Sequence, residues 1–226
     1  MKTAEARQPI QIGQVVRNAR IFNFRNFRDL PRDPLSDSNL LETVERLFKL
    51  LEERRIEYLL VGGIAILQYV DGRNTEDIDL IMALSSLELL PELEKVSQEK
   101  DDFARADFAG LQIDLLLTSN PLFAEVRRRY ASRRRFLERE IPCATPEGLV
   151  LLKLYALPSL YRHGNVARAA LYETDVLTLM SGQGVDPEPL LAELEPYVSA
   201  TDLKALRQIV AEIRQRLERA GSRFSD

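Results

Sequence analysis

The fold is decided by residues 61–82, which have the sequence VGGIAILQYVDGRNTEDIDLIM. The apolar run that ends at the pair Gly62-Gly63 predicts a buried strand, and IAILQYV predicts a short helix closed by Asp71-Gly72. EDIDLIMAL alternates acidic and apolar residues, as a strand with one buried face does. The segment therefore predicts two core strands joined through a glycine turn and a short helix.

Acidic side chains are expected to gather on one face of these strands. Residues two apart on a strand share a face, so Asp77 and Asp79 should point the same way. Asp114 stands alone among apolar residues in LQIDLLL, where a carboxylate is costly unless its face meets a site. If the two strands are neighbours, the carboxylates repel one another unless a cation neutralises them. A hard divalent ion such as Mg²⁺ or Mn²⁺ prefers these oxygen ligands, and three carboxylates can hold two metals.

A phosphate site is expected beside these aspartates. Gly62 and Gly63 follow a strand and precede a helix, which leaves backbone N–H groups to bind a nucleotide phosphate. Arg73 and Thr75 could add a charged fork and a hydroxyl donor. Each feature also has an ordinary interpretation: a tight turn for the glycines, a solvent-facing alternation or helix cap for Asp-x-Asp, and an edge strand for Asp114. Their occurrence together, in this order, favours the functional interpretation.

The rest of the sequence predicts an α+β core followed by helices. Residues 1–37 have no clear period and are interpreted as an N-terminal arm, residues 38–142 as the core and residues 143–226 as a C-terminal helical region. The core is expected to contain a helix near 40–54 with Asn39 as its N-cap, and helical spacing at 86–96 that Pro91 either breaks into two pieces or restarts as a new first turn. Two strands around a turn at 107–110 follow, and then a helix through 122–135 with Pro121 at its first position. Four further helices are expected at 145–157, 166–180, 186–198 and 201–220.

Composition restricts the chemistry available. The 226 residues are 45% hydrophobic and 29% charged, as in soluble globular proteins, and the net charge of −4 excludes a uniformly basic nucleic-acid coat. One Cys and one His exclude an internal disulfide, a zinc site of paired thiolates and sites of several imidazoles. Catalysis would therefore depend on carboxylates, Lys, Arg and backbone amides. The chain shows neither a membrane-length apolar stretch nor a secretory signal in MKTAEARQPIQIG, so a cytoplasmic location is expected.

Together these motifs resemble the nucleotidyltransferase superfamily related to DNA polymerase beta. VGG, then DIDLIM and a later QIDLL strand, is similar to that family's glycine pair, Asp-x-Asp and third Asp on a neighbouring strand. GRNTEDIDL is similar to the bacterial minimal nucleotidyltransferases, among them abortive-infection and toxin–antitoxin proteins. The resemblance covers roughly residues 38–182 and implies a mixed sheet flanked by helices.

The resemblance also implies an activity: metal-dependent transfer of a nucleoside monophosphate from an NTP, such as ATP, to a hydroxyl acceptor. It implies that Asp77, Asp79 and Asp114 bind the metal and are catalytic, with Asp114 helping to deprotonate the acceptor. TPEGLVLLKLYAL and RAALYETDVLTL extend the likeness. They imply that Lys153 approaches the nucleotide phosphates and that Asp175 supports Lys153 or the metal site.

The acceptor and the protein partners are less constrained. RNA, protein and small molecules are all candidate acceptors, and a toxin would imply an antitoxin partner. RRRYASRRR places six arginines at 127–129 and 133–135, which on one helix would form a docking stripe for tRNA or other RNA, or a solvated face offset by nearby glutamates. The alternative to an enzyme is a nucleotide-binding or protein-interaction module on the same fold. The intact aspartates favour the enzyme, because a degenerate copy usually loses one.

Overall fold

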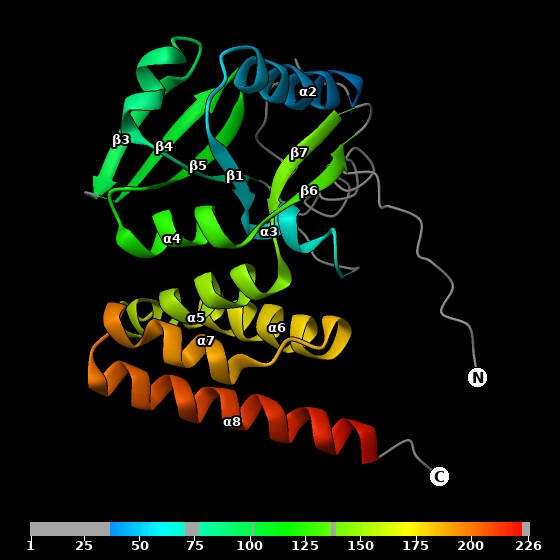
Figure 1. The fold of residues 1–226 in the computed structure, drawn as a ribbon, viewed down its shortest axis with the longest axis vertical. Coiled ribbons are helices and arrows are strands. Elements are labelled where there is room, and N and C mark those ends of the chain that lie inside the picture. Colours follow the sequence, from blue (N-terminus) through cyan, green and yellow to red (C-terminus); the bar gives the residue numbers. More distant parts are fainter. Residues whose placement is uncertain (1–36, 71–76, 101, 137–138, 223–226) are drawn as a thin grey trace, which may run out of the picture. The chain divides into compact units, whose positions relative to one another are not determined.

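The computed structural model describes residues 37–70, 77–100, 102–136 and 139–222 (Figure 1). These residues form two compact units. One contains the described residues through Ala124 together with Ser132–Cys143, and the other contains Glu125–Ala131 together with the described residues from Ala144 onward. Each unit is described by itself below.

A mixed seven-stranded sheet forms the framework of the first unit, with strand order β3-β4-β5-β2-β1-β7-β6 among the described residues. Its strands are β1 (Tyr58–Val61), β2 (Ile78–Met82), β3 (Glu94–Lys100), β4 (Phe103–Phe108), β5 (Leu111–Leu117), β6 (Ala131–Phe136) and β7 (Arg139–Ala144). β2 pairs with β5, and β1 with β7, in parallel, whereas β1–β2, β3–β4 and β4–β5 are antiparallel. This sheet with its helices confirms the expected α+β class.

Two helices belong entirely to this unit. α2 (Asp37–Glu53) buries Val44, Phe48 and Leu51 and contacts β5, which confirms the helix predicted near 40–54. The backbone is already helical at Asp37, so the prediction that Asn39 is the N-cap is wrong. α3 (Gly62–Ile66) begins at the glycines themselves, and a turn follows it. The predicted closure at Asp71-Gly72 lies outside the described residues.

The helix predicted over residues 86–96 is wrong. A 3₁₀ helix, η2 (Leu84–Leu89), precedes Pro91, and the chain then extends as β3. Proline has no N–H to continue a helical turn, and the pairing of β3 with β4 satisfies the following backbone groups instead. The hairpin predicted between β4 and β5 is confirmed. Its turn places Ala109 and Gly110 at φ 53° and 85°, and the Gly110 N–H donates to Asp107 Oδ1 at 2.8 Å.

The helix predicted over residues 122–135 is also wrong in its second half. α4 (Pro121–Arg129) ends before Ala131, and β6 then lies at the sheet edge beside β7, a strand that the sequence did not predict. Sheet pairing overrides local helix propensity here. The Ser132 hydroxyl, for example, donates to the Cys143 carbonyl at 3.1 Å. The six arginines therefore lie on a helix and a strand, and do not form one helical stripe.

Helices make up most of the second unit, and all four that were predicted are present. They are α5 (Pro146–Arg162), α6 (Val166–Gln183), α7 (Pro187–Leu194) and α8 (Ala200–Ser222). Thr145, Asn165 and Asp186 cap the first three, each accepting a backbone N–H with its side chain. α5 contacts the other three, and their buried leucines form the core of the unit. Within the described ranges, no helix has the length and apolarity that crossing a membrane requires.

Candidate active site

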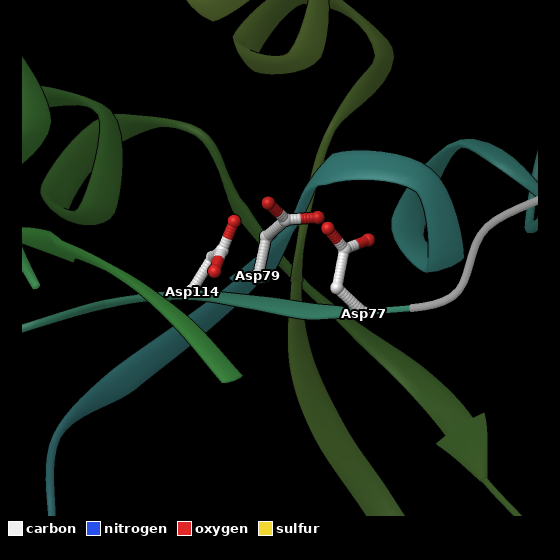
Figure 2. A group of neighbouring side chains, drawn as sticks. All are labelled: Asp77, Asp79 and Asp114. Atoms are coloured by element: carbon white, nitrogen blue, oxygen red, sulfur yellow. The ribbon is translucent and has the colours of Figure 1, made fainter. Parts of the chain in front are cut away.

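Three aspartates meet at one side of the sheet (Figure 2). Asp77 immediately precedes β2, Asp79 lies on β2 and Asp114 lies on β5. One carboxylate oxygen from each lies within 4.8 Å of the others. Asp114 is 1% exposed, and the other two are half-buried. The predicted cluster is therefore present in the structure, and Figure 2 shows the three carboxylates pointing away from the strands in the same direction.

The parallel pairing of β2 with β5 brings the carboxylates together. Asp79 is directly opposite Asp114 in the register, and paired residues on neighbouring strands point to the same face. The alternate positions Ile78, Leu80 and Ile113 are buried at 0–1% exposure. Burial of these apolar side chains therefore fixes which face carries the acids.

Gly62 stands at the end of β1, beside Asp79. The register pairs Val61 with Asp79, and Gly62 follows with φ at 65°, in the left-handed region. A Cβ at Gly62 would lie 1.7 Å from Asp79 Oδ2, so no larger residue fits. Gly63 is buried in α3. Arg73 and Thr75 lie outside the described residues.

Asp114 has two further partners that sequence reasoning missed. Arg105 on β4 donates from Nε to Asp114 Oδ1 at 2.8 Å and from Nη2 to Oδ2 at 3.4 Å. Gln112 donates from Nε2 to Oδ1 at 3.2 Å. The observed turn at Ala109 and Gly110 places residue 105 opposite residue 114, whereas a turn centred on the predicted range 107–110 would place it opposite residue 112.

Lys153 and Asp175 come together in the second unit, on α5 and α6. Lys153 Nζ lies 3.3 Å from Asp175 Oδ2 and 3.6 Å from the centre of the Tyr172 ring. Both charged residues are buried, with exposures of 5% and 3%. An ion pair and a cation–π contact thus stabilise a lysine deep in the helical unit.

The arginines at the end of α4 are partly neutralised. Glu125 accepts hydrogen bonds from Arg128 at 2.6 Å and from Arg129 at 3.4 Å, and Arg129 also pairs with Glu193 at 3.1 Å. The hydrogen bond from Arg128 lowers the pKa of Glu125, which keeps that carboxylate ionised. Two of the six arginines therefore already have acidic partners within this unit.

Comparison with solved structures identifies the fold. No protein-family model and no curated protein matches the sequence. A solved structure of an antigenic nucleotidyltransferase-like protein from Paracoccidioides brasiliensis is similar, with a TM-score of 0.55 and 19% identity over 83% of this chain and 94% of that one. The antibiotic-resistance factor ANT(2'')-Ia is also similar, with a TM-score of 0.50 and 15% identity over 83% of this chain and all of that one. This chain has the nucleotidyltransferase fold.

The acidic cluster on this fold suits a hard divalent cation. All three donors are carboxylate oxygens, with no His or Cys among them, and this donor set favours Mg²⁺ or Mn²⁺ over zinc. Two unit charges 4.8 Å apart repel by about 3.5 kcal/mol at an effective dielectric constant near 20. A cation among the oxygens converts this repulsion into attraction. The donor chemistry therefore fits the metal that the sequence predicted.

Proposed function

We propose that this chain is a metal-dependent nucleotidyltransferase that transfers a nucleoside monophosphate from an NTP to a hydroxyl acceptor. The observation that carries the proposal is the meeting of three carboxylate oxygens within 4.8 Å on a nucleotidyltransferase fold. Asp77, Asp79 and Asp114 would hold Mg²⁺ or Mn²⁺. When bound, the metal would neutralise the charge that develops on the triphosphate and the departing pyrophosphate.

The chain's own residues would align the reacting groups. The acceptor oxygen forms a bond to the α-phosphorus, the bond from that phosphorus to the bridging oxygen breaks, and its electron pair leaves with pyrophosphate. The hydroxyl proton passes to a carboxylate of the cluster, for which we propose Asp114. Gly62 is proposed to bind phosphate through its backbone, and its lack of a side chain is what allows the Asp79 carboxylate to lie beside it.

Nucleotide binding is assigned to Gly62, Gly63, Arg73 and Thr75, with Lys153 and Asp175 from the helical unit. Support for Lys153 comes from its contacts: its ammonium is buried and lies 3.3 Å from Asp175 Oδ2. A cationic side chain held in place by such a contact can contribute positive charge to a nucleotide site. ATP is the first NTP to test.

The acceptor is proposed to be RNA, protein or a small molecule. ANT(2'')-Ia is described as an antibiotic-resistance factor, so small-molecule acceptors belong among the substrates tested. Arg127–Arg135 would be the RNA contact, although Glu125 and Glu193 offset part of its charge. A toxin with an antitoxin partner, acting in the cytoplasm, is the most specific form of the proposal. A non-catalytic module that binds nucleotide or protein is the alternative.

Labelling would test the activity. The purified protein is incubated with each NTP labelled at the α-phosphate, with Mg²⁺ or Mn²⁺, and with total RNA, lysate protein or a small-molecule extract. We expect label in one acceptor class for the wild type and none for Asp79→Asn. Asp186→Asn is the matched control, because Asp and Asn cap a helix equally well and Asp186 caps α7. Equal labelling by wild type and Asp79→Asn, or none with any acceptor, would refute the enzyme in favour of the module.

A further inference from the structure

A row of paired residues crosses four neighbouring strands at the acidic cluster. Val61 on β1 pairs with Asp79 on β2, Asp79 pairs with Asp114 on β5, and Asp114 pairs with Arg105 on β4. Paired residues on adjacent strands share a face. The carboxylates of Asp79 and Asp114 and the guanidinium of Arg105 therefore lie in line on the face that carries the site.

Arg105 is bound to Asp114 by geometry that a chance surface pair seldom shows. Its Nε and Nη2 reach the two different oxygens of the carboxylate, at 2.8 Å and 3.4 Å. Gln112 adds a neutral donor to Oδ1 at 3.2 Å. The Asp114 side chain is 1% exposed, whereas the Arg105 side chain is 38% exposed. Arg105 and Gln112 thus hold the Asp114 carboxylate, one oxygen of which lies within 4.8 Å of an oxygen of Asp79.

Burial explains why a cation is needed at this position. Asp114 and Asp175 are the buried aspartates among the described residues, and each forms an ion pair with a cationic side chain. A buried carboxylate without such a partner is strongly destabilising, and Asp114 also faces two like charges. Arg105 supplies a compensating positive charge to Asp114, the most deeply buried member of the cluster.

We propose that Arg105 is a resident counterion of Asp114 and a positioning residue that holds the Asp114 carboxylate in one orientation before the metal binds. The metal part of this inference rests on the proposed function, whereas the coupling of Arg105 to Asp114 does not. Arg105 need not touch the nucleotide. It acts through Asp114, and the fork of its guanidinium fixes the carboxylate plane in a way that a lysine cannot reproduce.

A double-mutant cycle in metal-free buffer tests the coupling. The melting temperatures of wild type, Arg105→Gln, Asp114→Asn and the double variant are measured by circular dichroism with EDTA present. We expect Arg105→Gln to lower the Tm by about 5 °C or more, and by far less in the Asp114→Asn background, because the uncompensated charge is then gone. Equal effects of Arg105→Gln in both backgrounds would overturn the proposal.

A metal titration tests the counterion role. Wild type and Arg105→Gln are heated with increasing Mg²⁺ or Mn²⁺, and the metal should raise the Tm of the variant more, because it replaces the missing charge. Arg54→Gln is the matched control, since it breaks an exposed Arg–Glu92 ion pair in the same unit and should leave the metal response unchanged. A metal response in Arg105→Gln no larger than that of the wild type overturns the counterion role.

A replacement variant and two combined outcomes separate the role of Arg105 from the proposed metal-dependent function. If Arg105→Gln does not fold, Arg105→Lys replaces it in both experiments, with a smaller expected Tm loss because the charge remains and only the fork is lost. If the wild type shows no metal response while the cycle is non-additive, the proposed metal-dependent function fails and the pairing of Arg105 with Asp114 stands. An additive cycle with a wild-type metal response would overturn the role of Arg105 and leave the metal-dependent function standing.

Discussion

The α-carbon of Gly62 lies directly against the carboxylate of Asp79, so that a Cβ at residue 62 would stand 1.7 Å from Asp79 Oδ2. The backbone of Gly62 is also left-handed, with φ at 65°. These two constraints are independent: one concerns space and the other conformation. Both act at Gly62 because β1 ends beside the start of β2, where the pairing of Val61 with Asp79 brings the glycine turn next to the Asp79 carboxylate.

Gly62→Ala should therefore lower the free energy of unfolding by more than the strain of a left-handed alanine alone. Gly184→Ala is the matched control, because Gly184 has φ at 69° and a Cβ there would meet no atom within 4 Å. We expect Gly184→Ala to lower the free energy of unfolding by about 1 kcal/mol. Gly62→Ala should lower it by about 2–4 kcal/mol and abolish the metal-induced rise in Tm, since Asp79 must move. Denaturant titration measures the free energy of unfolding of each variant, and thermal melts with metal measure the rise in Tm. Equal losses of free energy in the two variants would contradict the predicted clash at Gly62.

Lys153→Met should destabilise the helical unit by about 3–5 kcal/mol, because it leaves the Asp175 carboxylate buried without its cation. The double variant Lys153→Met/Asp175→Leu should recover most of that loss, since two apolar side chains replace the ion pair. Urea denaturation measures both variants. If the recovered variant also transfers nucleotide with an unchanged KM for the NTP, then Lys153 has no role in nucleotide binding.

Cys143 should be inert in the native protein. The side chain is fully buried, and burial raises the pKa of its thiol to about 12, so almost no thiolate exists near neutral pH. We expect no reaction with a disulfide reagent such as DTNB at pH 8 over minutes. The chain unfolded in guanidinium should react at one thiol, the number its sequence contains. Rapid labelling of the native protein would show that β7 opens readily.

Tyr130 should make the protein sensitive to alkaline pH. Burial, followed by the hydrogen bond that its hydroxyl donates to Glu193 at 2.7 Å, raises the pKa of Tyr130 to about 12. The unfolded value is about 10, so the folded state holds the proton more tightly, and its stabilising contribution is lost as pH rises from about 10 through 12.

Thermal melts between pH 9 and pH 12 measure this loss of stability. Tyr130→Phe should show a shallower decline in Tm over that range than the wild type. Tyr161→Phe offers a parallel case, because a hydrogen bond to Glu173 raises the pKa of Tyr161 to about 12 in the same unit. Identical slopes for wild type and both variants would contradict these assignments.

Much of the fold and the three aspartates of the site could be predicted from the local pattern of apolar and acidic residues. The alternation in DIDLIM and QIDLL predicted two strands with acids on one face, and the register of β2 and β5 confirms it. The capping residues Thr145 and Asp186 marked true helix starts, because an N-cap satisfies backbone groups within a few residues of itself. The fold expected from the family resemblance is confirmed as well, by solved structures of low sequence identity.

The errors share one physical origin. EKVSQEK and ASRRRF carry residues that suit a helix, yet both form strands at opposite edges of the sheet, where β4 and β7 are their neighbours. Local propensities span about 1 kcal/mol per residue or less, so a neighbouring strand with backbone groups to pair outweighs them. Each neighbour lies only a few residues further along the chain, but residue propensities alone do not show that the two segments pair.

The sequence by itself determined which residues could perform chemistry: three aspartates on short apolar strands, a glycine pair and a single histidine and cysteine that exclude other sites. Which residues these side chains contact was determined only by the tertiary structure. It placed Gly62 against Asp79, Arg105 against Asp114 and Lys153 against Asp175, all contacts between different strands or helices. The two ion pairs form because a buried carboxylate is destabilising without a cation beside it, and the contact of Gly62 with Asp79 follows from the pairing of β1 with β2; both depend on strand register and helix packing, which local sequence pattern does not specify.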